Sequence, residues 1–155
     1  MINMQVKIEG LEKFKSALEE APYLTVTEIS KAIQKSLITV ANQAKKEAPV
    51  NKGFGGGTLR QKITSLPIME TRLRGKIESQ APYSGYVEGG TRPHIIRVKN
   101  KKVLANKRLG KFFGEKVKHP GTKANPFFQR AVEKTKTKVD EFFSKALENI
   151  TKSLT

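Results

Sequence analysis

The chain has 155 residues, and its 30 lysines and arginines outnumber its 14 aspartates and glutamates, which gives a formal net charge of +16. The length suits a single domain spanning residues 1–155, and the 37% hydrophobic content excludes a disordered chain. The lack of cysteine excludes a disulfide framework and a thiolate zinc site.

The N-terminal segment is expected to form a strand and a short helix. Met4, Val6 and Ile8 alternate with polar residues, a pattern typical of a half-buried strand and unlike the apolar core of a signal peptide. Apolar residues at helical spacing predict a helix over 11–18, closed by Pro22. Since no apolar run approaches the roughly 18 residues that span a bilayer, we expect a soluble chain without a membrane partner.

A second helix is predicted to end before Pro49, because the residue preceding proline avoids helical angles. Thr25 and Glu28 have capping-box spacing, at which a hydroxyl and a carboxylate satisfy free N–H groups of the first turn. One apolar stripe follows at three- and four-residue steps: Ile29, Ile33, Leu37, Val40, Ala41, Ala44 and Ala48.

The middle of the chain predicts a glycine-rich loop over 51–58 and several short strands. Residues 59–66 fit either a strand or a short helix. Alternation of Leu73, Gly75 and Ile77 predicts a strand. Further strands are expected over 95–98 and 103–105, joined by a turn at 99–101, and over 112–117.

A long amphipathic helix is predicted at the C-terminus, with Asn125 as its N-cap and Pro126 at its first position. Its apolar face comprises Phe128, Val132, Val139, Phe142, Phe143, Ala146, Leu147 and Ile150. The fold class is therefore α+β. A small antiparallel sheet is packed by N-terminal helices and the long C-terminal helix, and a basic hairpin protrudes.

The segment 92–123 is strongly basic and contains one acid, Glu115. Its cations are Arg92, Arg97, Lys99, Lys101, Lys102, Lys107, Arg108, Lys111, Lys116, Lys118 and Lys123. With Phe112 and Phe113 among them, such a surface suits sequence-independent binding to nucleic acid, through phosphate contacts and stacking. Such a surface also suits docking against an acidic protein face. We favour protein docking over nucleic-acid binding because the segment carries no nucleic-acid-binding motif.

Catalytic interpretations find little support in the sequence. The glycine-rich loop lacks the lysine of a phosphate-binding loop, since Thr58 directly follows Gly57. His94, His119 and Glu88 could form a metal site or an acid–base pair, which leaves a metal-dependent nuclease as a third hypothesis. Each histidine adjoins a proline, however, as expected where an imidazole caps a turn. We expect no cofactor and no enzymatic activity.

Four ordered motifs carry a family resemblance. They are 7–11 (KIEGL), 44–50 (AKKEAPV) leading to 57–60 (GTLR), 81–83 (APY) leading to 88–94 (EGGTRPH), and 119–127 (HPGTKANPF). Together they resemble the tail-completion or neck proteins of long-tailed phages, which act as minor tail or head–tail joining proteins. The sequence departs from that pattern in a longer link at 51–56 and in Gly89, where the family often has an aromatic residue.

The resemblance implies a non-enzymatic virion protein of the neck, assembled in the host cytoplasm as a closed ring, with six copies to match the tail. Its implied partners are other copies of itself, the head connector or stopper, the tail terminator or tail-tube proteins, and DNA in the channel. The candidate residues for contacts with subunits or DNA are Glu88, Arg92, His94, Arg97, Lys99, Lys101, Lys102, Lys107, Arg108, Lys111, Phe112, Phe113, His119 and Lys123.

Overall fold

A computed structural model describes residues 3–4, 23–50, 56–69, 73–99, 103–106 and 110–154. Within them the chain forms two compact units, residues 1–84 with 127–155 and residues 85–126. Helices combined with small antiparallel sheets, and a long C-terminal helix, confirm the α+β class. That residues 1–155 form a single domain stays a prediction.

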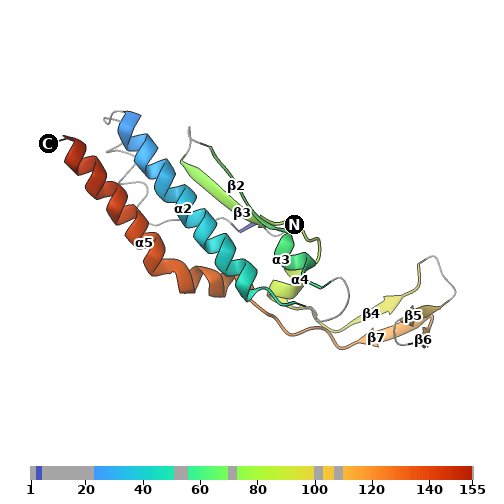
Figure 1. Cartoon of the computed structure of the whole chain (residues 1–155). Coiled ribbons are helices and arrows are strands. Elements are labelled where there is room, and N and C mark those ends of the chain that lie inside the picture. The colour runs from blue at the N-terminus through green and yellow to red at the C-terminus, as the bar shows by residue number, and fades with distance from the viewer. Residues whose placement is uncertain are drawn as a thin grey trace. The chain divides into compact units, whose positions relative to one another are not determined.

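Two long helices, α2 (Tyr23–Glu47) and α5 (Phe127–Leu154), form the frame of the first unit. They lie side by side and run in opposite directions (Figure 1). Glu47, at the end of α2, accepts hydrogen bonds from Arg130 Nε at 3.2 Å and Lys134 Nζ at 2.6 Å, in the first turns of α5. At the other end of the pair, Asn149 Nδ2 donates to Glu28 Oε2 at 2.9 Å.

The apolar stripe predicted for α2 is confirmed, since all seven of its residues are buried. Spacing by three and four residues places them on one face of the helix, which packs against α5 and the sheet. From α5, the largest buried contribution is Phe127, which is fully enclosed and has its ring 4.8 Å from that of Phe128.

The capping box predicted for α2 is wrong, although the end of the helix is right. The helix begins at Tyr23, so Thr25 lies inside it and is buried, with 6% of its surface exposed. Glu28 binds Lys31 and Asn149. The contact with α5 is tertiary, and a local pattern cannot predict it. At the other end α2 stops at Glu47, before Pro49.

The three-stranded antiparallel sheet has the order β1-β3-β2. Its strands are β1 (Asn3–Met4), β2 (Ile63–Met69) and β3 (Arg74–Ser79). The ambiguous segment 59–66 contains both structures, because α3 (Thr58–Gln61) ends just before β2. Gly57, with φ 91°, provides the left-handed turn into α3. Leu59, Ile63 and Ile77 are buried beneath α2.

The second unit contains four short strands that nest as two antiparallel pairs: β4 (His94–Arg97) with β7 (Lys116–His119), and β5 (Leu104–Asn106) with β6 (Lys111–Gly114). Neighbouring β4 and β5 were expected to be linked by a turn, yet each pairs with a later strand. We call the described residues between Thr91 and Thr122 the arm. The basic segment therefore forms paired strands as predicted, with β5 and β6 lying between β4 and β7 in the sequence.

The other expectations differ by small shifts or fall outside the described ranges. The short helix α4 (Ser84–Gly89) precedes the arm. Helix α5 begins at Phe127, one residue after the expected start, and the Asn125 N–H donates to the Val87 carbonyl at 2.9 Å. The helix predicted over 11–18 and most of the glycine-rich loop lie outside the described residues. No helix in the described ranges is long and apolar enough to cross a membrane.

Candidate assembly arm and its base

The two motifs richest in glycine and proline meet at the base of the arm. The Thr91 N–H donates to the Thr122 carbonyl at 3.0 Å, and the Thr122 N–H donates to the Thr91 carbonyl at 3.1 Å. The two hydroxyl oxygens also lie 3.0 Å apart, and Thr91 Oγ1 accepts a second bond from the Thr122 N–H. The two hydroxyls thus join segments 31 residues apart.

The pairing of the arm continues in one register from the threonines into β4 and β7. His94 faces His119, and Arg97 faces Lys116. The same register sets Pro93 opposite Pro120, and neither proline has an N–H to donate. No backbone hydrogen bond can therefore join the two prolines, and the paired strands β4 and β7 begin at the histidines.

Glycine is required on both strands of the base. Gly90 has φ 71°, and a Cβ there would lie 2.6 Å from the Thr122 carbonyl oxygen. Gly121 has φ 89°, and a Cβ there would collide with the Thr91 carbonyl oxygen. Both angles are in the left-handed region, which favours glycine. Close backbone approach explains the glycine in each motif, a role that the sequence alone did not assign.

The two histidines stack across the arm and cap its turns, as the adjoining prolines led us to expect. Their ring centroids are 5.0 Å apart, with the planes inclined by 29°. His94 Nδ1 donates to the Arg92 carbonyl at 2.9 Å, and His119 Nδ1 accepts from the Gly121 N–H at 3.0 Å. His119 must therefore carry its proton on Nε2. Each imidazole thus positions backbone at the base of the arm.

No group of three or more histidine, aspartate or glutamate side chains that could hold a metal is present among the described residues. His94 and His119 meet each other, and Glu88 does not complete such a group with them. A metal on His119 Nε2 would also have to displace the proton that the Gly121 contact requires there.

Side chains alternate between the two faces of a strand pair, so β4 and β7 give the arm two faces. On one face, His94 and Ile96 lie across from His119 and Val117. On the other, Ile95 and Arg97 lie across from Lys118 and Lys116, and we call these four residues the lysine face. All four are exposed, and 52% of the Ile95 surface is accessible.

Aromatic side chains are exposed towards the tip of the arm. Phe112 is 77% exposed and Phe113 is 47% exposed, both on β6. Adjacent residues of a strand point to opposite faces, so the two phenylalanines lie on opposite faces of β6. Together with Ile95 and Ile96, they give this narrow two-stranded element more exposed apolar surface than it can bury within itself.

The other candidate residues are placed as follows. Lys99, Lys111 and Lys123 are exposed, as is Arg92 at the base, whereas Glu88 is half-buried in α4. Four candidates lie outside the described residues: Lys101, Lys102, Lys107 and Arg108. The exposed Ile95 and Ile96 were missed, because alternation alone does not reveal whether a strand has a covering layer.

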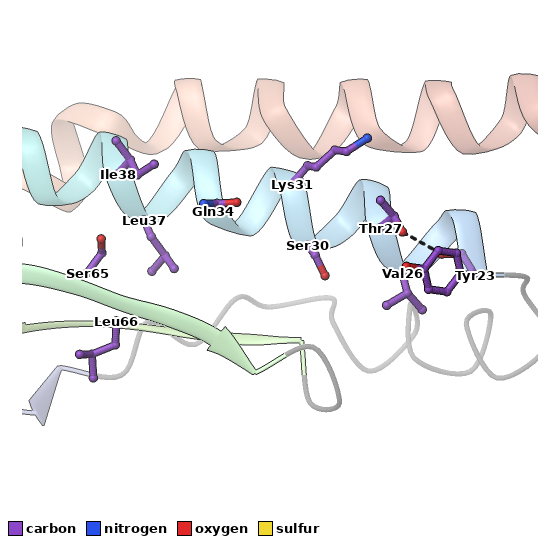
Figure 2. A pocket seen from close by; sticks show the side chains of 10 residues that line it. All are labelled: Tyr23, Val26, Thr27, Ser30, Lys31, Gln34, Leu37, Ile38, Ser65 and Leu66. Atoms are coloured by element: carbon purple, nitrogen blue, oxygen red, sulfur yellow. Dashed lines mark hydrogen bonds between the residues drawn. The ribbon is translucent and has the colours of Figure 1, made fainter.

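A separate cavity of about 510 Å³ lies between α2 and β2 in the first unit (Figure 2). Apolar side chains such as Leu37 and Leu66 line it together with polar ones such as Ser30 and Gln34. Among its described lining residues, only Tyr23 and Lys31 are ionisable. The described part of the lining therefore contains no carboxylate or imidazole that could act with them as an acid–base pair.

The fold and the arm together define a small α+β protein whose distinctive feature is an arm of short strand pairs with exposed basic and apolar side chains. Residues 12–90 match the model of a family described as "Bacteriophage HK97-gp10, putative tail-component". The chain belongs to this family of phage tail proteins, as its motifs predicted. No curated protein and no solved structure shows significant similarity to it. The matched region stops at Gly90, immediately before the threonine pair of the arm.

Proposed function

We propose that this tail component is a non-enzymatic subunit of the head–tail junction. It forms a closed ring, six copies in number, that completes the tail or joins it to the head connector. The observation that carries the proposal is the exposed apolar surface of the arm, above all Phe112 at 77%. Membership of a tail-component family gives this surface its context among other virion proteins.

The physical argument rests on how poorly a two-stranded ribbon supports itself. An isolated pair of strands is marginally stable in water, and three or more strands or a packed helix are normally needed. Both β4 and β6 are exposed along their whole length. Contact with a neighbouring subunit would cover Ile95, Phe112 and Phe113, so assembly would bury apolar surface and stabilise the arm in the same step.

Removal of the arm tests the proposal. The threonine pair is hydrogen-bonded through both backbone N–H groups, so a two-residue Asn-Gly turn can replace residues 92–121 between Thr91 and Thr122. We expect the first unit to keep its helical circular dichroism, while phages carrying this variant accumulate unjoined heads and tails in electron micrographs. Wild-type protein supplied in trans is the control. Normal yields of infectious particles from the shortened chain would contradict the proposal.

The alternative function is sequence-independent DNA binding by the segment 92–123. It is favoured by the exposed cations of β4 and β7, which lie beside exposed aromatic side chains. This alternative predicts duplex binding that weakens steeply with salt, with a slope set by the number of phosphates contacted. Charge reversal at Lys101, Lys102, Lys107 and Arg108 would remove most of that binding. Negligible duplex binding at moderate salt would exclude it.

A further inference from the structure

The acidic residues of α5 are concentrated on its solvent side, in a chain whose net charge is +16. Glu133, Asp140, Glu141 and Glu148 are all exposed; Asp140 and Glu141 are adjacent, and each lies seven or eight residues from Glu133 and from Glu148. Because this spacing returns to the same side of a helix, they form one strip. We call these four residues the acidic strip.

One border of the acidic strip carries Leu147 and Lys136, and the other carries lysines alone. Leu147, 43% exposed, follows Asp140 by seven residues and so lies beside the strip on the side facing the buried face of α5. Lys136 is exposed on the same side, and the opposite border carries Lys134, Lys138, Lys145 and Lys152. A surface that combines cations with an apolar side chain could pair its cations with the four acids and its apolar side chain with Leu147.

The arm has this combination of groups. On the lysine face, Arg97, Lys116 and Lys118 surround Ile95. The lysine face spans about 7 Å from Lys116 to Lys118 at the rise of a strand, so it would cover part of the strip and not its whole length.

We propose that the lysine face of one copy docks on the acidic strip of the next copy, with Ile95 against Leu147. This inference rests on the proposed ring and identifies its two contact surfaces. The contact is heterologous, since one patch meets a different patch, and such contacts generate rings when the rotation closes.

Charge explains why a second copy is favoured over DNA as the occupant. Copies with a net charge of +16 repel one another, so a stable ring needs a local contact between opposite charges. The strip supplies acids and the lysine face supplies cations. The contact that Glu148 already makes within its own chain competes only weakly with docking of the lysine face. Glu148 pairs with Lys152 at 2.9 Å, but both side chains are more than half exposed, and such surface pairs contribute little.

Cross-linking between copies tests the contact directly, because the natural chain has no cysteine. Full-length K118C and full-length E141C, carrying different tags, are co-assembled into phage tails and treated with a short bismaleimide linker. We expect linked pairs containing one chain of each kind. The control pairs K118C with K62C, an exposed position directly after α3, and should give no such product.

A second experiment reverses the charges of the two surfaces. Reversing the lysine face (R97E, K116E, K118E) or the strip (D140K, E141K, E148K) should each reduce ring formation at least about tenfold, since like charges then face each other. Combining both sets in one chain should restore it. The matched control K46E, R60E, K62E changes the net charge by the same amount as the first set and should leave rings intact.

The outcomes separate this inference from the proposed function. If tails contain no ring of this chain, the proposed function fails and the inference fails with it. If rings form but K118C and E141C do not link, or if neither reversal weakens the ring, the inference alone is overturned. If reversal of the lysine face abolishes duplex DNA binding and leaves ring formation unchanged, the lysine face binds DNA, which also overturns the inference.

Discussion

Gly90 and Gly121 stand beside the threonine pair with backbone angles that other residues rarely adopt. They let the two strands approach so closely that a Cβ on either glycine would meet backbone atoms of the opposite strand. The same close approach places the hydroxyl of Thr91 within bonding distance of the Thr122 N–H. At the scale of single residues, the base of the arm is thus set by backbone geometry, and the adjoining histidines complete its hydrogen bonds.

Gly121→Ala should open this base. The substitution forces a Cβ towards the Thr91 carbonyl oxygen in a left-handed backbone, and backbone cannot move aside as a flexible side chain can. We expect faster hydrogen exchange at the Thr91 and Thr122 amides, with the core of the first unit unaffected. Gly89→Ala is the matched control, because Gly89 is helical and a Cβ there meets nothing within 4 Å. Equal protection in both variants would contradict the account.

Glu47 makes the stability of the helix pair depend on pH. Hydrogen bonding from Lys134, and then from Arg130 and Gln43, lowers the pKa of this carboxyl from its ordinary 4.5 to about 2. A group whose pKa is depressed by folding stabilises the protein above its unfolded pKa, and that contribution is lost as pH falls towards the folded value.

The E47Q variant should accordingly be less stable than the natural chain near neutral pH. The difference should shrink as pH falls from about 4.5 towards 2, the range over which the natural carboxyl takes up its proton. Urea unfolding at a series of pH values measures this. A difference that stays constant across that range would mean that the ion pairs with Arg130 and Lys134 do not carry the effect.

At the scale of elements, the two long helices were predictable and the pairing of the arm was not. The stripe from Ile29 to Ala48 and the amphipathic pattern of α5 are local and strongly periodic, so each helix could be read from its own residues. The partner of β4 is a strand about 20 residues away, which neither strand specifies alone. The start of α2 was misplaced for a related reason, since Glu28 bonds to Asn149, 121 residues away.

The site was predictable to a similar degree. Both motifs and the cationic character of the segment between them stand out in the sequence, and both histidines bond to backbone as expected. The direct contact between the motifs, and the exposure of Ile95 and Phe112, depend on which strands pair and on whether a further layer covers them. Neither property is local to the residues concerned.

Phe127→Ala tests the packing of α5 at the point where the helix begins. Its side chain is fully buried against the core, so truncation should destabilise the protein by about 3–5 kcal/mol. Phe112→Ala removes the same atoms from an exposed position and should change the free energy of unfolding by less than about 0.5 kcal/mol. Denaturant unfolding of both variants makes the comparison. If both substitutions lower the free energy of unfolding by the same amount, then Phe127 is not the core residue that its burial indicates.

At the scale of the whole molecule, charge and exposed apolar surface favour the same kind of function. A chain with a net charge of +16 does not associate through general attraction, and the arm exposes more apolar surface than a solitary hairpin can sustain. A tail component with both properties would be suited to ordered assembly on a partner, in which specific contacts overcome repulsion between copies.

Electron cryomicroscopy of the assembled phage particle tests the central claim most directly. The account predicts density for this chain at the junction of head connector and tail tube, as a closed ring of six copies with each arm in contact with a neighbouring subunit. Particles in which the chain is absent from the junction, or is present there as separate copies with free arms, would contradict it.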